Sequence, residues 1–348
     1  MFTSRPRSHL RLAALLAAVL GTTGAALPAA EAHREPALCT SPRDPALAAR
    51  MSQDITAALR DRDSTVSVAV HDPGRALRCR LRDTRLYDSA SIAKILIMQA
   101  VLGRAEELGR APTRLEARRL KAMITRSDNT AATDLWQGLS RARLNRVLRE
   151  AGAKDTVLGH DRYWGLTRTT ARDQLALLAA VSRRTEALDL MGQVVTSQAW
   201  GVTAGAPGTV KVHLKNGWLP RATHAWRVHS IGIALSSGTG GTATLDYRMA
   251  LLSHDNPTMR YGVRTLEGVA LAVHRGLAGG TAARGFTPEY RISGTPDGSV
   301  PYDAPEPHPP APAHPPQEWG TSPGVVPPSR TARDRRRAPR RPRSRPSG

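Results

Sequence analysis

The sequence predicts a mixed α/β fold of the α+β kind, in which both ends of the chain build one antiparallel sheet and an all-helical subdomain is inserted between them. Apolar and polar residues alternate as in strands over residues 64–83 and again over 208–255. Between residues 89 and 180 the apolar spacing is helical instead. Strands at both ends with helices between them favour one sheet with an insert.

The N-terminal part predicts one helix and one β-hairpin. The segment ALAARMSQDITAAL, residues 46–59, has apolar residues at helical spacing. The segment STVSVAVHD, residues 64–72, alternates and is rich in β-branched residues, as strands are. The segment GRALRCRLRD, residues 74–83, follows a Pro-Gly turn and is its expected partner strand.

The helical insert is expected over about residues 88–205. Its main interruptions are LGRAPT, residues 108–113, and AGAKDTVLGHDRYWGLTRT, residues 151–169. Thr170 precedes the apolar run ARDQLALLAAV and is expected to be the N-cap of that helix.

The C-terminal part returns to strands and ends in a helix. The expected strands are GTVKVHLKNGW, AWRVHSIGIALSS and TATLDYRMALLSHD, over residues 208–218, 225–237 and 242–255. A closing helix is expected from Met259 to Leu277. The folded domain is therefore placed at residues 33–293.

Residues 1–32 have the pattern of a signal peptide. A basic stretch, MFTSRPRSHLR, precedes the apolar LAALLAAVLGTTGAALPAA, and AEA forms a small-residue cleavage site. A membrane anchor fits less well because a Gly-Thr-Thr-Gly stretch and Pro28 break the apolar run. We expect a secreted, extracellular protein that begins near His33, without stable membrane insertion.

The charge is strongly positive and unevenly distributed. The 348 residues carry 50 Lys and Arg against 29 Asp and Glu, a net charge of +21, and only five of the basic residues are Lys. Residues 294–348 are rich in Pro and Arg and are expected to be a solvated, disordered tail. Basicity of this kind gives no reason to expect a nucleic-acid partner, and we expect a monomer.

The two cysteines, Cys39 and Cys79, are expected to form a disulfide bond. In an oxidising compartment two remaining cysteines most simply pair. The pair has no His at ligand spacing, so the sequence predicts no metal site.

Three short motifs carry the candidate chemistry: SIAK from Ser91 to Lys94, SDN from Ser127 to Asn129, and KNG from Lys215 to Gly217. Each alone has a structural explanation, namely a lysine whose amine reaches water, a helix N-cap, and a turn at a strand end. Their order along the chain, however, is helix start, helical insert and late strand. That is the pattern of penicillin-recognising serine enzymes, which carry S-x-x-K, S-D-N and K-T-G.

With these motifs the sequence resembles the class A β-lactamase family over roughly Cys39 to Leu277, and MITRSDNTAATDLW is similar to the family's S-D-N segment. The resemblance implies a β-lactamase-like fold and a serine hydrolase that opens a β-lactam amide through an acyl-serine intermediate. It implies no cofactor. The implied partner is a small molecule, either a β-lactam or a cell-wall peptide.

Residue chemistry supports Ser91 as nucleophile and Lys94 as its base. The two residues are one helical turn apart, so both side chains emerge on the same face. A serine hydroxyl needs a base within hydrogen-bond reach. Burial of Lys94 among apolar neighbours, next to a second cation, favours the neutral amine that can act as this base.

The resemblance also implies roles for the other two motifs. Ser127 would pass a proton to the leaving nitrogen, and Asn129 would orient Lys94 and bind the acyl amide. Asp128 would point into the fold and hold the loop. Lys215 would fix the substrate carboxylate.

The resemblance further implies a substrate site along the KNG motif. The backbone N–H groups of Ser91 and Trp218 would form an oxyanion hole, beside Gly217. Asn216 replaces the family's Thr, and its amide is expected to meet the substrate carboxylate instead.

The loop before Thr170 departs from the family pattern. Class A enzymes carry a Glu there that activates water for deacylation, but residues 153–170 contain no Glu. Asp155, His160 and Asp161 are the titratable candidates. We therefore expect acylation of Ser91 without an evident base for fast release. A β-lactamase is the leading prediction, and two alternatives stay open: a DD-peptidase-like amide hydrolase and a slow-turnover penicillin-binding sensor.

Overall fold

A computed structural model describes residues 37–236 and 245–278, all of which belong to one compact unit. The expected signal peptide, residues 1–32, and the expected tail, residues 294–348, lie outside the described residues. Both boundaries therefore stay predictions. Among the described residues, no helix combines the length and the hydropathy that a membrane span requires.

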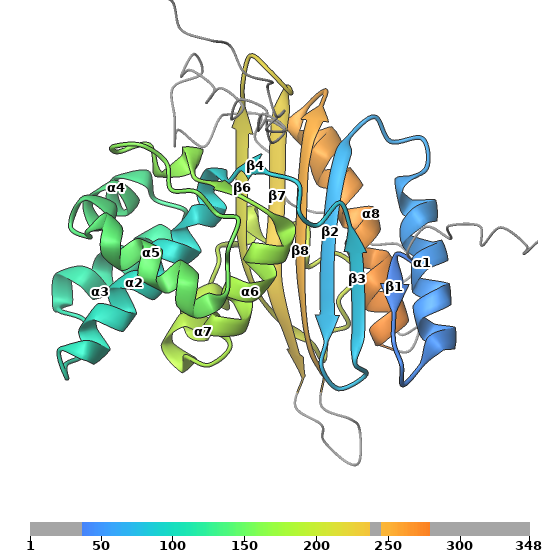
Figure 1. The fold of residues 1–348 in the computed structure, drawn as a ribbon, viewed down its shortest axis with the longest axis horizontal. Helices are drawn as coiled ribbons and strands as arrows, with labels where there is room; N and C mark the ends of the chain where they lie inside the picture. The colour runs from blue at the N-terminus through green and yellow to red at the C-terminus, as the bar shows by residue number, and fades with distance from the viewer. Residues whose placement is uncertain (1–36, 237–244, 279–348) are drawn as a thin grey trace, which may run out of the picture. The chain divides into compact units, whose positions relative to one another are not determined.

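The predicted sheet is present, and both ends of the chain build it (Figure 1). N-terminal and C-terminal strands meet where β2 pairs antiparallel with β8, which places Val68 opposite Leu251. In spatial order the six strands are β1 (Cys39–Thr40), β3 (Leu77–Leu81), β2 (Thr65–Asp72), β8 (Leu245–Asn256), β7 (Trp226–Ser236) and β6 (Lys211–Pro220). The predicted α+β fold class is thus confirmed.

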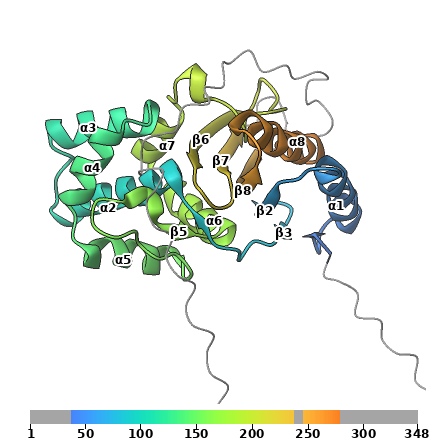
Figure 2. The ribbon, with the colours of Figure 1, turned by 90° about the horizontal axis from the view of Figure 1, so that it is seen from above.

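Helices cover both faces of this sheet. Figure 2 shows α1 (Pro45–Leu59) and α8 (Met259–Leu277) together on one side and the helical insert on the other. A separate apolar core fills each interface. The insert comprises α2 (Lys94–Glu107), α3 (Arg114–Thr125), α4 (Asn129–Gln137), α5 (Arg141–Ala151), α6 (Ala171–Val181) and α7 (Thr185–Met191).

Short elements join the insert to the sheet. A 3₁₀ turn, η1 (Ala90–Ala93), leads directly into α2, and η2 (Trp164–Leu166) lies in the loop before α6. The remaining elements are η3 (Thr196–Gln198) and a two-stranded pair of β4 (Tyr87–Asp88) with β5 (Arg168–Thr169). The sequence did not predict this pair, because two-residue strands carry no alternation that can be recognised.

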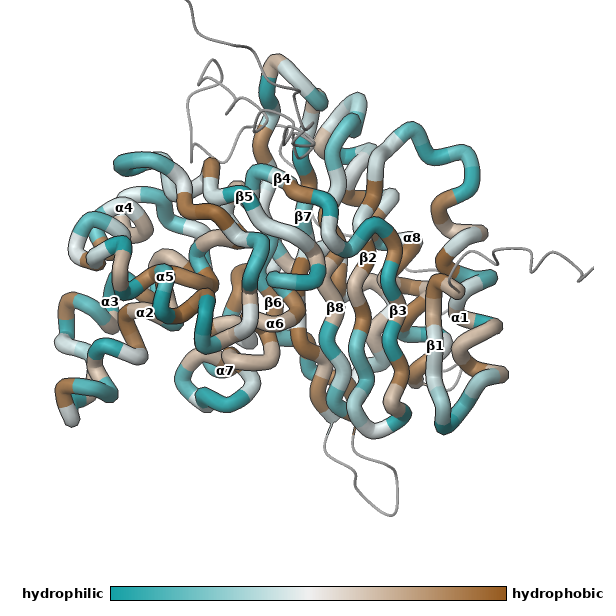
Figure 3. Tube along the Cα trace, in the orientation of Figure 1, coloured by the Kyte–Doolittle hydropathy of each residue, from teal (hydrophilic) through white to brown (hydrophobic). Residues whose placement is uncertain are grey.

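The sequence patterns explain these elements locally. Thr170 caps α6 as predicted, since its hydroxyl accepts from the backbone nitrogen of Asp173 at 3.1 Å. Strand β3 alternates between buried and exposed residues, which Figure 3 shows as alternating hydropathy. In contrast, α2 is buried almost all round because it runs through the centre of the insert.

The predicted disulfide is present. Cys39 and Cys79 are bonded and face each other across β1 and β3. Both cysteines belong to the core between the sheet and α1. The bond attaches the first strand of the described chain to the hairpin at the sheet edge.

Candidate active site

The SIAK motif places Ser91 and Lys94 side by side at the start of the insert. Ser91 lies in η1, and Lys94 is the first residue of α2, so the α-helix begins slightly later than predicted. The Nζ atom of Lys94 lies 2.8 Å from the Oγ atom of Ser91. Both residues are fully buried. The preceding residue, Ala90, has φ of 46°, a left-handed conformation that is unusual for a residue with a side chain.

The SDN motif meets this pair from the connection between α3 and α4. Lys94 Nζ lies 2.7 Å from the backbone oxygen of Ser127, 2.9 Å from its hydroxyl, and 2.7 Å from Oδ1 of Asn129, all within hydrogen-bond distance. Ser127 has φ of 58°, and strained residues of this kind concentrate at functional sites. Asp128 is the N-cap of α4, where its carboxylate accepts from the nitrogen of Ala131 at 2.7 Å.

Lys215 joins the same group from the sheet. It extends from β6, and its Nζ donates to the hydroxyl of Ser127 at 3.0 Å and to the backbone oxygen of Asn216 at 2.7 Å. The structure therefore brings Ser91, Lys94, Ser127 and Lys215 into one continuous line of polar contacts.

Gly217 allows β6 to approach η1 closely. A Cβ atom at this position would lie only 2.9 Å from the backbone nitrogen of Ser91 and 3.0 Å from that of Ile92. The backbone of the KNG strand thus runs directly beside the N–H group of the candidate nucleophile. Trp218 follows, and its ring packs edge-on against that of Trp200 with centroids 5.9 Å apart.

Asn216 faces away from this line of contacts. Its amide nitrogen donates to the backbone oxygens of Gln198 and Trp200 at 2.8 and 3.1 Å. These bonds fasten β6 to the segment that precedes it. The role of Asn216 in binding a substrate carboxylate stays a prediction.

The loop before α6 presents an indole ring to Lys94. The Nζ atom of Lys94 lies 4.7 Å from the centre of the Trp164 ring, and Trp164 itself is fastened by a 3.1 Å bond to the hydroxyl of Thr133. Sequence reasoning missed this residue. The only signal was a bulky aromatic residue within a polar loop.

The three titratable candidates of the loop lie elsewhere. Asp155 forms an ion pair with Arg172 at 2.7 Å on the surface. His160 and Asp161 are exposed. The group that this loop places beside Lys94 is therefore the Trp164 ring and not a carboxylate.

A buried charged cluster supports the segment before η1. The carboxylate of Asp88 lies 3.6 Å from Arg221 and 3.3 Å from Arg227, and all three side chains are almost fully buried. The backbone oxygen of Asp88 lies 2.8 Å from Nε2 of His229. Burial lowers the pKa of His229 to about 3, so this ring is neutral at pH 7 and donates from Nε2. Sequence reasoning missed this cluster because its members are far apart in the chain.

A hydroxyl beside a buried amine, a second hydroxyl and a second amine is the arrangement of groups expected of a serine hydrolase of the β-lactamase type. The family comparison agrees, because residues 110–228 match the model of the Beta-lactamase enzyme family. No curated protein sequence matches this chain.

Several solved structures share the fold of this chain. The structure of PBP-A has a TM-score of 0.54 at 18% identity, and the match covers 66% of this chain and 96% of that one. The TLA-3 extended-spectrum β-lactamase has a TM-score of 0.56 at 14% identity, with 64% and 97% covered. A mutant of the class A β-lactamase of the last common ancestor of Gram-negative bacteria has a TM-score of 0.53 at 20% identity, with 64% and 97% covered. The predicted β-lactamase-like fold is confirmed, and the match of residues 110–228 supports the predicted class A β-lactamase-like family.

Proposed function

We propose that this protein is an exported serine hydrolase that β-lactams acylate at Ser91 and that releases the acyl group slowly. The observation that carries this proposal is the contact of Lys94 Nζ with the hydroxyls of both Ser91 and Ser127, at 2.8 and 2.9 Å. The same amine can accept a proton from the nucleophile and return it toward the leaving group.

The first step is attack of Ser91 Oγ on the carbonyl carbon of the β-lactam. Neutral Lys94 takes the hydroxyl proton as the new C–O bond forms. The developing oxyanion lies against the backbone N–H groups of Ser91 and Trp218, beside the close approach at Gly217. Donors of this kind typically stabilise the transition state by about 3 to 4 kcal/mol each.

The second step is cleavage of the C–N bond of the β-lactam. The proton moves from Lys94 through the hydroxyl of Ser127 to the leaving nitrogen. Lys215, 3.0 Å from that hydroxyl, holds Ser127 and provides a positive charge for the substrate carboxylate. The product of these steps is an ester between Ser91 and the opened β-lactam.

Release of this ester needs an activated water. The loop before α6 contains no Glu and turns Trp164 toward Lys94, with its three candidate bases at the surface. The position of these groups supports slow hydrolysis. A solved variant of PBP-A is an acyl-enzyme complex with penicillin G, which supports the same chemistry for this fold.

A β-lactamase with rapid turnover is the second candidate, and the match to the Beta-lactamase enzyme family favours it. A DD-peptidase-like activity on cell-wall peptide uses the same acylation steps. The Cys39–Cys79 disulfide supports export, because disulfides persist in oxidising compartments.

A chromogenic cephalosporin distinguishes these functions. We expect a rapid burst in which each protein molecule opens one cephalosporin, followed by little further colour change. Mass spectrometry should then show one opened β-lactam attached to Ser91. Ser91→Ala should abolish both the burst and the adduct, whereas Ser89→Ala should retain them. Sustained turnover would support the β-lactamase instead, and absence of any adduct would contradict acylation by β-lactams.

A further inference from the structure

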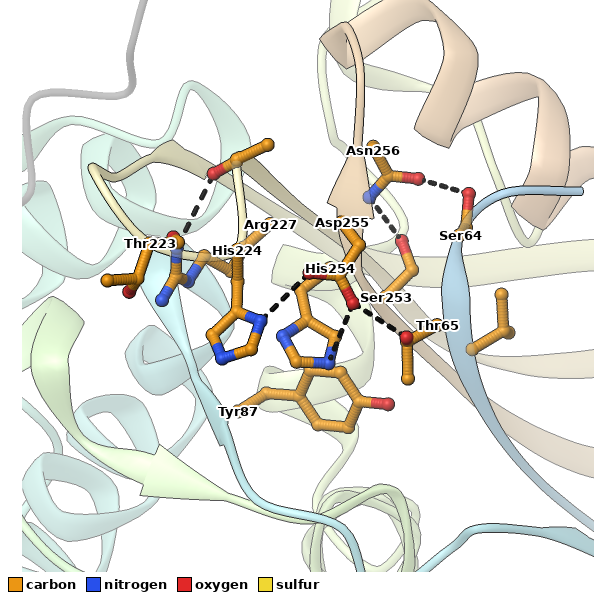
Figure 4. A network of polar contacts seen from close by, with 12 residues as sticks. Ser64, Thr65, Tyr87, Thr223, His224, Arg227, Ser253, His254, Asp255 and Asn256 are labelled. Carbon is orange, nitrogen blue, oxygen red and sulfur yellow. Dashed lines mark hydrogen bonds and ion pairs between the residues drawn. The ribbon is translucent and has the colours of Figure 1, made fainter. Parts of the chain in front are cut away.

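A second polar cluster lies at the end of the sheet, where the turn between β6 and β7 meets the end of β8 (Figure 4). His224 comes from that turn, and its Nδ1 lies 2.8 Å from Oδ1 of Asp255. His254 precedes Asp255 on β8, and its Nε2 lies 3.5 Å from Oδ2 of Asp255. The hydroxyl of Thr65, on β2, donates to the same Oδ2 at 2.6 Å.

His254 is the unusual member of this cluster. The residue is 5% exposed, yet its Nε2 has no hydrogen-bond partner. Its ring is enclosed by Tyr87, with centroids 4.9 Å apart, and by His224, with centroids 4.2 Å apart. A buried polar atom without a partner is uncommon in a native fold and calls for a ligand, an ion or a water. In Figure 4 this nitrogen points toward Asp255.

We propose that His224, His254 and Asp255 form a site for a divalent transition-metal ion of the Zn²⁺ type. Each residue offers one ligand atom, and these atoms all lie within 4.8 Å of one another. Two ligand atoms of one tetrahedral zinc ion are about 3.4 Å apart, so a pair of atoms near the 4.8 Å limit must close by more than 1 Å. His224 can provide this movement because its side chain is 45% exposed.

The donor set selects the class of ion. Two imidazole nitrogens and one carboxylate suit Zn²⁺, Co²⁺ or Ni²⁺, whereas Mg²⁺ and Ca²⁺ prefer oxygen ligands alone. The Thr65 hydroxyl fixes the orientation of the carboxylate in the way that outer-shell partners do at metal sites.

The surrounding charge limits the affinity. Arg85 and Arg227 both act electrostatically on His254, and their positive charges disfavour a cation. Asp255 supplies the opposing negative charge. We therefore expect a site that binds metal specifically but less tightly than a structural zinc site with four protein ligands.

Binding would connect the turn after β6 to β8. The arginines on either side of this turn, Arg221 and Arg227, pair with Asp88, three residues before Ser91. A metal here would therefore hold the end of the strand that carries Lys215. Sequence reasoning predicted no metal site because it considered only the cysteines, and the ligands come together only when the β6–β7 turn reaches β8.

Titration of the chelator-treated full chain with Co²⁺ tests this proposal. We expect the visible absorption of nitrogen-coordinated cobalt to saturate at one equivalent and Zn²⁺ to displace it. His224→Ala should weaken binding by about 100-fold or more, because even outer-shell changes cost 10–100-fold. His224 is exposed, so this variant should fold. Asp255→Asn, which keeps the shape and tolerates the left-handed backbone at φ of 60°, should weaken binding similarly.

His160→Ala is the matched control, because His160 is an exposed loop histidine outside the cluster. It should bind Co²⁺ like the wild type. Zn²⁺ should also raise the melting temperature of the wild type and of His160→Ala but not of His224→Ala. Unsaturable binding, or equal affinity in wild type and His224→Ala, would overturn the proposal.

Discussion

The side-chain nitrogen of Lys215 lies 3.0 Å from the hydroxyl of Ser127, although the two residues are 88 positions apart in the chain. Lys215 belongs to the sheet and Ser127 to the helical insert, so this contact crosses between the two layers. Lys94 approaches the same hydroxyl from the other side, at 2.9 Å. Ser127 therefore lies between two amines, and the predictions below depend on that arrangement.

Lys94→Ala should slow acylation by a β-lactam about 10²- to 10⁴-fold, the usual contribution of a general base. The variant keeps Ser91 but removes the amine 2.8 Å from its hydroxyl. The rate is measured with a fluorescent penicillin, and circular dichroism checks the fold. Lys121→Ala, on the exposed face of α3, is the control and should acylate normally. A wild-type rate in Lys94→Ala would show that another group is the base.

Gly217→Ala should lower the acylation rate about 10²- to 10³-fold, as loss of an oxyanion-hole donor does. The added Cβ would lie 2.9 Å from the nitrogen of Ser91, so β6 has to move away from η1. The same labelled penicillin measures the effect. Gly208→Ala is the control, because a Cβ there meets no atom within 4 Å. Equal rates in both variants would mean that the close approach at Gly217 has no role in acylation.

Removing the Cys39–Cys79 bond by a double change to Ala should lower the free energy of unfolding by about 4 kcal/mol, on the chain-entropy model for a loop of this length. Urea denaturation measures the loss. Acylation should stay unchanged, because the bond joins β1 and β3 at the edge of the sheet opposite β6. A large loss of acylation in a folded variant would contradict this separation of disulfide and active site.

Glu267→Gln should stabilise the protein at pH 8 but not at pH 4. Glu267 lies on α8 and is 6% exposed, and desolvation raises its pKa from 4.5 to about 7. Because the folded-state pKa is the higher one, the stabilising contribution of the protonated carboxyl is complete below about pH 4.5 and is lost as the pH rises through 7. The loss is at most about 3 kcal/mol.

Urea denaturation at several pH values measures this effect. The wild type should lose stability between pH 4.5 and 8 relative to Glu267→Gln, and the exposed Glu150→Gln should behave like the wild type. Parallel pH curves for wild type and Glu267→Gln would show that Glu267 is charged in the folded protein at neutral pH.

The motifs predicted much of the candidate site because their spacing is local. Ser91 and Lys94 lie within one turn of each other in any helical conformation, so their contact follows from the sequence. The same holds for the alternation that predicts β2 and for the spacing that predicts α8. In contrast, nothing local shows that Trp164 faces Lys94 or that the amide of Asn216 bonds to the carbonyl oxygens of Gln198 and Trp200.

By itself the sequence determined the long helices and strands, their order along the chain, and which residues carry nucleophilic and basic groups. Only the tertiary structure decided which groups meet: Lys215 with Ser127, Gly217 with the nitrogen of Ser91, and His224 with Asp255. The physical reason is the separation in sequence over which each interaction acts. Backbone periodicity and contacts between neighbouring side chains act over a few residues. The placement of β6 beside η1 depends instead on the packing of two apolar cores on opposite faces of one sheet.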